Sequence, residues 1–457
     1  MSAANDVLEL IGDTPMVKVK NLDTGPCELF LKLESHNPGG SIKDRIALEM
    51  IEAAERDGHL QPGGTLVEAT AGNTGLGLAL VASQKGYRLA LVIPDKMSQE
   101  KIFHLKALGA EVIMTRSDVV KGHPEYYQDV ARRVAEERGG FYVNQFENPN
   151  NPAAHEHSTG PEIWQQMGHR IDAVVCGVGS GGTLTGLGRF FRGVDPRIEM
   201  VLADPRGSVL APYVNEGVMI EAGSWLVEGI GEDFIPRNCD LSLVRKAYSI
   251  SDAESIATAR ELLKREGLIC GSSSGTLIAA ALRYCREQER PRRVVSFVCD
   301  SGNKYLSKIF NEYWLDDHGF VLREETNDLR DLITHPHTRK SAVIVLPTDT
   351  LQAAYRKMKM YDVSQLPVMG EDGKLAGIVS ETDLLLAVAG DPKAFKLPVA
   401  DAMVTHLVTI QFQQPVEDLL PIFESSMVAI VMDGDRFLGL ITPIDLLQYL
   451  RKRIAQA

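Results

Sequence analysis

Short apolar runs alternate with helix-length segments between residue 60 and about residue 320, and this alternation constrains the fold more than any other feature. The runs are rich in β-branched residues, as buried strands are: LALVIP, AEVIMT, AVVCGV, IEMVLAD and VVSFVCD. Strands that alternate with helices form a parallel sheet covered by helices. We therefore predict an α/β domain whose functional groups lie at the carboxyl ends of the strands.

Composition narrows the class of protein. A chain of 457 residues exceeds one hydrophobic core, and its apolar runs are too short to span a membrane. The net charge of -13 argues against nucleic-acid binding and favours small metabolites as partners. The six cysteines contain no CxxC pair, so neither a metal site nor a disulfide framework is expected. The first residues lack a basic, apolar export signal, so we expect a cytoplasmic protein.

The character of the chain changes after YWLDDHGF. The following stretch, REETNDLRDLITHPHTRK, is charged and lacks apolar periodicity, as linkers do. Beyond it, LPVMGEDGKLAGIVSETDLLLAV is echoed by AIVMDGDRFLGLITPIDLLQYL, and Gly439 lies 62 residues after Gly377. We therefore predict a catalytic domain, a linker and two repeats, with the bounds 1–316, 317–334, 335–396 and 397–457.

Each repeat has the pattern of a strand, an Asp/Gly turn, a second strand and a helix. Ser380 with Asp383, and Thr442 with Asp445, occupy equivalent positions at the two predicted helix starts. An aspartate there can bind both hydroxyls of a ribose, while the helix N-terminus attracts an anion. The same spacing fits a simple capping box equally well, so both interpretations stay open.

A lysine follows a glycine pair in NPGGSIKDRIALEMI, residues 37 to 51. Ser41 and Asp44 have the spacing of a capping box, and apolar residues then recur at helical spacing. Lys43 would lie in the first turn, where the helix dipole lowers the pKa of its amine. Such an amine is a nucleophile that forms imines, although a solvated surface lysine is the alternative for this residue alone.

Two glycine-containing loops predict anion binding. In ATAGNTGLGLAL, the loop from Thr70 to Thr74 offers backbone N–H groups and hydroxyls to a carboxylate or phosphate, unless it is only a turn. In AVVCGVGSGGTLTG, glycines precede a helix start that suits a phosphate. This stretch also matches G-x-G-x-x-G, with Asp204 at the end of the next strand, so a dinucleotide-binding oxidoreductase is an alternative.

A serine-rich turn, LICGSSSGTLIAAAL, gives a further loop. We expect Cys270 to Gly275 to join a strand end to a helix, where the Ser273 hydroxyl could face a heterocyclic nitrogen instead of only capping the helix. An imine-forming lysine, a carboxylate site, a phosphate site and a hydroxyl are together what pyridoxal phosphate needs to act on an amino acid.

The motifs NPGGSIKDR, TAGNTG, GVGSGGT and GSSSG resemble the pyridoxal-phosphate β-family of serine- and cysteine-metabolising enzymes over residues 6 to about 315. DPRGS and VEGIGEDFIP resemble cystathionine β-synthases more than cysteine synthases, and the repeats resemble the tandem CBS-domain (Bateman) module of the former. The resemblance implies the fold-type II architecture, similar to the tryptophan synthase β subunit, with parallel twisted sheets. It also implies a homodimer or a higher homo-oligomer.

The resemblance assigns roles to residues. Lys43 would bind pyridoxal phosphate covalently and move the α-proton, Asn73 would bind the ring hydroxyl, and Ser273 the pyridine nitrogen. The phosphate would be bound by Gly179, Ser180, Gly181, Gly182 and Thr183. The amino-acid substrates would be bound by Thr70, Ala71, Gly72, Thr74, Gln145, Glu228 and Gly229, with Glu228 receiving the ammonium group of the second amino acid.

The implied reaction condenses L-serine with L-homocysteine to cystathionine, with release of hydrogen sulfide when cysteine replaces serine. S-adenosylmethionine or AMP would bind the repeats at Ser380, Asp383, Thr442 and Asp445. No haem is expected, because the haem-binding extension of animal enzymes has no counterpart here. Ala71 replaces a usual serine and Phe146 a tyrosine of the animal enzymes, so cysteine synthase stays an alternative. A regulatory protein on an inactive lyase fold is disfavoured, because the cofactor residues are present.

Overall fold

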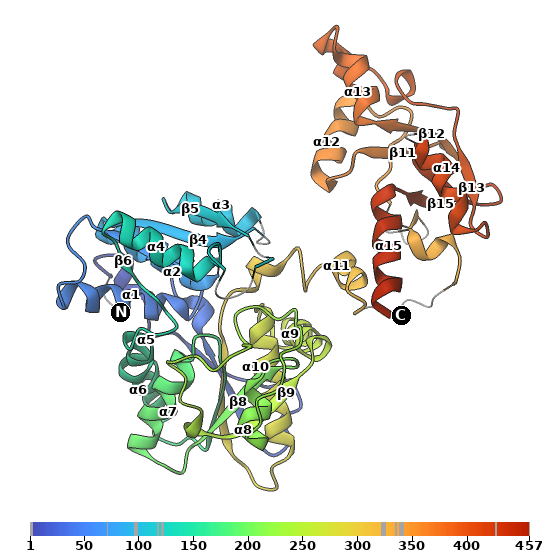
Figure 1. Cartoon of the computed structure of the whole chain (residues 1–457). Coiled ribbons are helices and arrows are strands. Elements are labelled where there is room, and N and C mark those ends of the chain that lie inside the picture. The colour runs from blue at the N-terminus through green and yellow to red at the C-terminus, as the bar shows by residue number, and fades with distance from the viewer. Residues whose placement is uncertain are drawn as a thin grey trace. The chain divides into compact units, whose positions relative to one another are not determined.

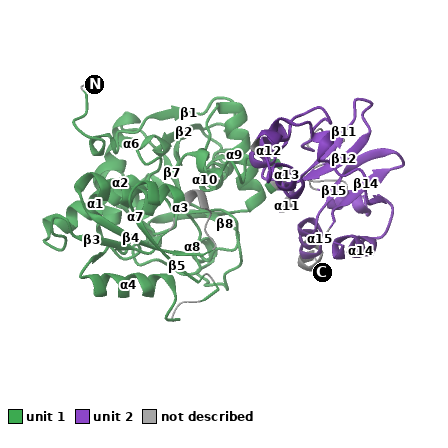
Figure 2. Ribbon diagram, turned by 90° about the horizontal axis from the view of Figure 1, so that it is seen from above, with its two compact units in different colours: residues 1–314 green, residues 315–457 purple. Residues whose placement is uncertain are grey.

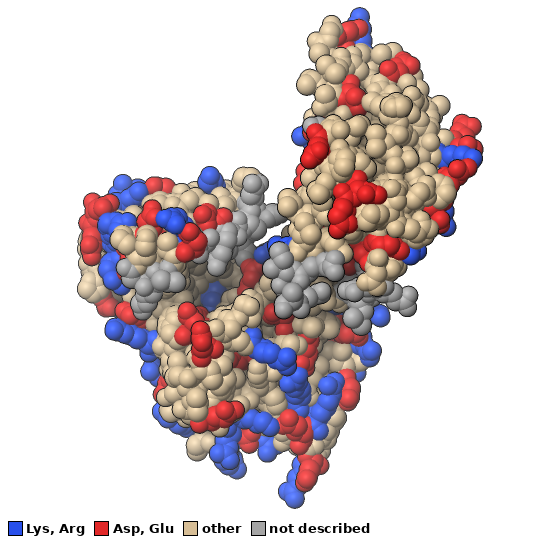
Figure 3. Space-filling model, turned by 45° about the vertical axis from the view of Figure 1, so that its right-hand side comes forward, with Lys and Arg blue, Asp and Glu red and all other residues tan. Residues whose placement is uncertain are grey.

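The structure is a computed structural model that describes the chain except residues 1–2, 71, 96–98, 117, 120–122, 321–325, 334–335, 338–341, 426 and 457. The chain divides into two compact units, unit 1 (residues 1–314) and unit 2 (residues 315–457), coloured separately in Figure 2. On the face shown in Figure 3, basic and acidic side chains of unit 1 are interspersed, with no broad basic patch. Among the described residues, we find no helix with the length and hydrophobicity that a bilayer crossing requires.

Unit 1 contains a six-stranded sheet, of which β8 and β9 are labelled in Figure 1. Five of its strands run parallel to one another, namely β2, β10, β7, β8 and β9. The remaining strand, β1, pairs antiparallel with β2 at the edge. Three predicted apolar runs form the adjacent strands β10, β7 and β8, which confirms the parallel sheet. In order across the sheet, the strands are β1 (Met16–Lys18), β2 (Glu28–Leu33), β10 (Arg293–Val298), β7 (Ala173–Gly177), β8 (Glu199–Pro205) and β9 (Val244–Ile250).

A second, four-stranded parallel sheet of unit 1 is covered by helices on both faces. Side chains of a strand alternate between faces, so Leu66 and Leu91 pack against α1 and α2, whereas Val67 and Val92 pack against α4. Burial on both faces explains why the two central strands, β3 and β4, are mostly apolar. In order across the sheet, the strands are β5 (Glu111–Thr115), β4 (Arg88–Pro94), β3 (Thr65–Glu68) and β6 (Phe141–Tyr142).

The helices of unit 1 alternate with its strands, as predicted. They are α1 (Lys43–Arg56), α2 (Asn73–Lys85), α3 (Gln99–Ala107), α4 (Tyr127–Arg138), α5 (Asn150–Ala154), α6 (Gly160–Gln166), α7 (Gly182–Val194), α8 (Leu210–Glu216), α9 (Asp252–Glu266) and α10 (Ser272–Arg286), with α11 (Glu312–Asp317) at the boundary between the units. A π-helical turn, His155–Thr159, joins α5 to α6. The strand expected before Ser272 is wrong, because this segment is irregular and Cys270 makes only an isolated bridge to Ser301.

Unit 2 contains the predicted repeat. In each copy an antiparallel strand pair leads into a helix, and the pairing is irregular at equivalent places, after Val368 and after Val431. Gly377 and Gly439 pair with these two valines, so the predicted correspondence is confirmed. The elements are α12 (Leu351–Tyr361), β11 (Gln365–Met369), β12 (Leu375–Ser380) and α13 (Glu381–Val388), then β13 (Thr409–Gln411), α14 (Leu419–Glu424), β14 (Ala429–Asp433), β15 (Arg436–Ile441) and α15 (Pro443–Gln456).

Part of the segment predicted as a linker, 317–334, belongs to the core of unit 2. Leu329, Leu332 and Ile333 are buried in the apolar cluster of the second repeat, and the Leu329 N–H donates a hydrogen bond to the Phe412 carbonyl. Burial of these three apolar side chains stabilises their packing against the second repeat, despite the charged composition of the sequence around them. Residues 321–325 of the same segment lie outside the described residues.

Candidate active site

The loops after β2, β3 and β7 meet the start of α10 around a cavity of about 270 Å³, the unit 1 cavity. The structure brings every predicted cofactor and substrate residue to it except Ala71, which lies outside the described residues. These lining residues are Lys43, Thr70, Gly72, Asn73, Thr74, Gln145, Gly179, Ser180, Gly181, Gly182, Thr183, Glu228, Gly229 and Ser273. They come from distant parts of the sequence, and the parallel topology gathers them.

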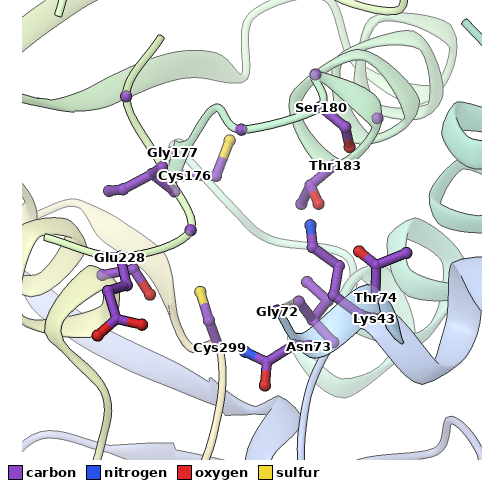
Figure 4. A pocket seen from close by; sticks show the side chains of 18 of the residues that line it. Lys43, Gly72, Asn73, Thr74, Cys176, Gly177, Ser180, Thr183, Glu228 and Cys299 are labelled. Carbon is purple, nitrogen blue, oxygen red and sulfur yellow. The ribbon is translucent and has the colours of Figure 1, made fainter. Parts of the chain in front are cut away.

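Lys43 is the first residue of α1 and extends into the cavity toward Thr183 (Figure 4). Its amine makes no hydrogen bond to any residue that the structure describes. Burial lowers the pKa of Lys43, and the surrounding acidic groups, Asp300 and Glu232 among them, only partly oppose this effect. The sequence-based prediction of a lowered Lys43 pKa therefore has the right direction, and burial of the amine is the largest cause of the shift.

The predicted capping box at the start of α1 is wrong. The cap residue is Ile42, and the Lys43 N–H donates to Ser41 Oγ at 3.2 Å. The buried Asp44 carboxylate instead accepts a hydrogen bond from the Gly39 N–H, at 2.5 Å. Asp44 therefore stabilises the glycine turn ahead of the helix, because that turn folds back over it.

The glycine loop after β7 forms an anion cradle. A Cβ at Gly179 would lie 2.5 Å from the Gly229 carbonyl oxygen, and one at Gly182 would lie 1.9 Å from Asn151 Oδ1, so neither position accepts a side chain. Gly181 has a φ of 85°, which favours glycine. No side chain caps the N-terminus of α7, so its first N–H groups are available to an anion.

Thr183 in this cradle is held by a buried histidine. His155 Nε2 lies 3.1 Å from Thr183 Oγ1, and His155 Nδ1 lies 2.9 Å from Thr159 Oγ1. Burial lowers the pKa of His155 well below its ordinary value, so the ring is neutral, with one nitrogen as donor and the other as acceptor. The π-helical turn thus orients the Thr183 hydroxyl; sequence reasoning missed His155, because no local motif marks it.

The carboxylate loop is fixed by hydrogen bonds. Thr74 Oγ1 donates to Gln145 Oε1 at 2.7 Å, which leaves the Gln145 amide N–H groups for a ligand. The Gln145 backbone N–H donates to the Glu68 carboxylate at 3.0 Å. The Gly72 N–H donates to Thr70 Oγ1 at 3.2 Å. Thr70, Thr74 and Gln145 therefore lie together, as predicted, although Gln145 is distant in sequence.

Asn73 is held in place by two contacts. Its Nδ2 donates to Asp300 Oδ2 at 2.8 Å, and its Oδ1 accepts from Lys304 Nζ at 2.8 Å. One amide hydrogen is left for a group in the cavity, because an amide nitrogen has two. Ser273, in the first turn of α10, also lines the cavity, and its neighbour Ser272 accepts a hydrogen bond from the Glu228 N–H.

Two carboxylates of one loop have different environments. Glu228 lies across the cavity from Lys43 (Figure 4) and forms an ion pair with Lys308 at 2.6 Å. Glu232 also lines the cavity, and burial raises its pKa to about 8. Sequence reasoning chose Glu228 and missed Glu232, because only the fold shows that Lys308 reaches the first of the two.

Asp204 does not suit the dinucleotide alternative. It is fully buried, and its carboxylate accepts a hydrogen bond from the Ala211 N–H at 2.8 Å. It therefore stabilises the start of α8 and cannot bind a ribose.

Comparison with known proteins agrees with this geometry. Residues 7–300 match the family of pyridoxal-phosphate-dependent enzymes, and residues 329–390 and 399–452 match CBS domains. The chain belongs to the pyridoxal-phosphate-dependent enzymes. The cystathionine beta-synthase of Dictyostelium discoideum is 38% identical and that of Apis mellifera 36%, each over 98% of this chain and 92% or 91% of its own length. The predicted resemblance, fold class and β-replacement or lyase class of this enzyme are confirmed.

Other relatives match about two thirds of the chain. A cysteine synthase of Staphylococcus aureus is 42% identical over 66% of this enzyme and 96% of its own length. The crystal structure of a hydrogen sulfide-producing enzyme from Fusobacterium nucleatum matches with a TM-score of 0.62 and 37% identity, over 66% of this enzyme and 98% of that chain.

The residues of the unit 1 cavity fit pyridoxal phosphate. A side-chain-free glycine loop faces the cavity beside an uncapped helix N-terminus, which suits a phosphate group. The buried amine of Lys43, without a hydrogen bond among the described residues, suits an imine.

Unit 2 of the enzyme contains a larger cavity of about 510 Å³, the unit 2 cavity. It is lined by Thr442 and Asp445 together with residues 362–365 of the first repeat. Ser380 and Asp383 do not line it. Both pairs form helix-start contacts, since the Ser380 N–H and the Thr442 N–H each donate to the aspartate three residues later, at 2.8 Å.

Proposed function

We propose that this enzyme condenses L-serine with L-homocysteine to give L-cystathionine and water. The observation that carries the proposal is the presence of Lys43, both anion sites and Ser273 in one cavity, in a chain whose similarity to cystathionine beta-synthases extends through both CBS domains. Similarity to the cysteine synthase covers only 66% of the chain. Release of hydrogen sulfide when cysteine replaces serine is part of the same proposal.

Each residue of the cavity has a separate task. Pyridoxal phosphate, when bound, supplies an electron sink for the substrate α-carbon. Lys43 binds the cofactor and carries the α-proton on its Nζ, and burial of this amine lowers its pKa and so favours its neutral form. Gly179 to Thr183 hold the phosphate, while Asn73 and Ser273 orient the ring. Thr70 to Thr74 and Gln145 hold the substrate carboxylate.

Cysteine synthase is the second candidate, and Phe146 favours it. Phe146 lines the unit 1 cavity and packs against Phe234, with ring centroids 6.0 Å apart. An apolar wall at this place offers no hydroxyl to a second amino acid, so a small nucleophile such as sulfide would also fit.

Product analysis distinguishes the candidates. Purified protein with pyridoxal phosphate is given serine plus homocysteine, or O-acetylserine plus sulfide, at matched concentrations. Dominant cystathionine supports the proposal, and dominant cysteine supports cysteine synthase. Lys43→Ala is the control for reaction outside this site.

We also propose that an adenosyl ligand, S-adenosylmethionine or AMP, binds the unit 2 cavity and regulates the enzyme. Asp445 lies at the start of α15, where a ribose and an anionic group could bind together. Isothermal titration calorimetry with each ligand tests the proposal, and no heat of binding with either would contradict it. A second ligand at Ser380 and Asp383 stays a prediction, as do the homodimer or higher homo-oligomer and the absence of haem.

A further inference from the structure

Glu232 is a carboxyl group held in the unit 1 cavity without a task in the reaction described so far. Its backbone is anchored on both sides, because its N–H donates to Ser208 Oγ and its carbonyl accepts from the Val209 N–H, each at 3.1 Å. Its side chain makes no hydrogen bond or ion pair to any part of the chain that the structure describes. Glu228, by contrast, is paired with Lys308.

The surroundings of Glu232 favour a carboxyl that gains and loses a proton near neutral pH. Burial is the largest cause of the raised pKa, Asp233 and Asp204 add to it, and Lys43 opposes it. The titratable groups that face Glu232 come from β8, its own loop, the starts of α1 and α4, and the loop before β9: Asp204, Asp233, Lys43, Tyr126, Tyr127 and Cys239. Lys43 is close enough for each group to shift the pKa of the other.

We propose that Glu232 is the acid and base for the groups that leave and enter at the substrate Cβ, while Lys43 handles only the α-proton. This inference rests on the proposed function. Hydroxide is a poor leaving group, and a thiol attacks as its thiolate, so each half of a serine-to-thioether exchange needs a proton transfer at Cβ. A carboxyl that exchanges its proton near neutral pH can perform both transfers.

The proton and electron balance closes over one turnover. Lys43 Nζ takes the α-proton, the C–H electron pair forms the Cα=Cβ bond, and the Cβ–O pair leaves with oxygen, which takes the Glu232 proton as water departs. The Glu232 carboxylate then takes the proton of the incoming thiol while sulfur bonds to Cβ. The Cα=Cβ pair returns to Cα, which recovers its proton from Lys43. Serine and a thiol thus give a thioether and water, and both side chains are restored.

The test compares two leaving groups in the holoenzyme. Acetate can leave without accepting a proton, whereas the serine hydroxyl must be protonated to leave as water. Glu232→Gln should therefore slow reaction with serine about 10²- to 10⁴-fold and reaction with O-acetylserine by less than about threefold. The measurement is the single-turnover absorbance change of the bound cofactor after each substrate is added alone. Glu232→Asp should recover part of the serine rate, and Glu221→Gln, which makes the same change at an exposed glutamate outside the cavity, is the matched control.

An equal loss with both substrates, or an unchanged rate with serine, would overturn the proposal. A second readout needs no turnover: the infrared difference spectrum of cofactor-free protein between about pH 6 and about pH 9 should contain a protonated-carboxyl band that Glu232→Gln removes. Absence of that band in the wild type would also overturn it.

The outcomes separate this inference from the proposed function. A wild-type enzyme that reacts with serine but forms no cystathionine from homocysteine refutes the assigned nucleophile and leaves the role of Glu232 supported by the leaving-group comparison. A wild-type enzyme that reacts with O-acetylserine and not with serine overturns both.

Discussion

The unit 1 and unit 2 cavities differ in which of their polar groups already form hydrogen bonds within the protein before a ligand binds. In unit 1, residues such as Asn73 and Gln145 are fixed by other parts of the protein, and the Lys43 amine is left without a hydrogen bond among the described residues. In unit 2, Asp445 accepts hydrogen bonds from the Thr442 N–H and hydroxyl. The catalytic cavity is preorganised, whereas a ligand of unit 2 must share or replace contacts within the protein.

A buried ionic network explains part of this preorganisation. Arg45, two residues after Lys43, forms ion pairs with Glu34 at 2.8 Å and with Glu162 at 2.6 Å. Lys32, whose side chain is 0% exposed, also pairs with Glu162, at 2.7 Å. Ions buried this deeply must be paired, so the network fixes the start of α1 against β2 and α6.

The largest expected effect is the loss of activity when Lys43, whose amine points into the unit 1 cavity, is replaced. Lys43→Ala should lower product formation at least about 10³-fold, because it removes both the cofactor attachment and the proton carrier. Ligand binding by unit 2 should be unchanged. Product formation and calorimetry measure the two effects, and Lys246→Ala on β9 is the control. A Lys43→Ala enzyme with a tenth of the wild-type rate or more would contradict the assignment.

The next effect concerns the network under the catalytic cavity. Burial raises the pKa of Glu162, but the hydrogen bonds and charges of Arg45 and Lys32 outweigh burial and lower this pKa to about 2. Because the pKa of Glu162 is lower in the folded state than its ordinary value of 4.5, the ionised carboxylate stabilises the folded state at pH values above 4.5. This stabilisation is lost as the pH falls toward about 2. Glu162→Gln should therefore reduce the free energy of unfolding of unit 1 by about 3–5 kcal/mol at neutral pH, less at acid pH.

Urea unfolding at several pH values measures this loss. Glu261→Gln, which breaks the exposed pair with Arg265, should cost less than about 1 kcal/mol. Equal costs for Glu162→Gln and Glu261→Gln would show that the buried network does not stabilise unit 1 as its geometry indicates.

A smaller effect is expected in the unit 2 cavity. Asp445→Asn should weaken binding of the adenosyl ligand about 10- to 100-fold, because a neutral amide replaces a charged acceptor of ribose hydroxyls. Calorimetry with S-adenosylmethionine and with AMP gives the affinities. Unchanged affinity would place the ligand elsewhere in unit 2.

The smallest effect compares the two repeats. Ser380 and Asp383 form a complete capping box at the start of α13 and do not line the unit 2 cavity. Asp383→Asn should thus cost about 1 kcal/mol of stability through the lost cap and change ligand affinity less than about threefold. A loss of affinity as large as that of Asp445→Asn would show that the first repeat also binds ligand.

The sequence by itself determined the parallel α/β fold, the repeat in unit 2 and most residues of the unit 1 cavity. The physical reason is that these features are local: apolar runs make strands, glycine turns open helices, and parallel strands gather their carboxyl ends. Lys43, the loop at Thr70 to Thr74 and the loop at Gly179 to Thr183 each lie in such a turn.

Only the tertiary structure decided how charged and polar groups are paired, since a partner distant in sequence leaves no local pattern. Lys308 comes 80 residues after Glu228 and neutralises it, whereas Glu232 stays unpaired among the described residues of the same cavity. The predicted capping box was wrong for the same reason, because the Asp44 carboxylate accepts a hydrogen bond from the Gly39 N–H and does not cap the start of the helix. Likewise, packing of the two repeats against each other brought Asp445, and not Asp383, to the unit 2 cavity.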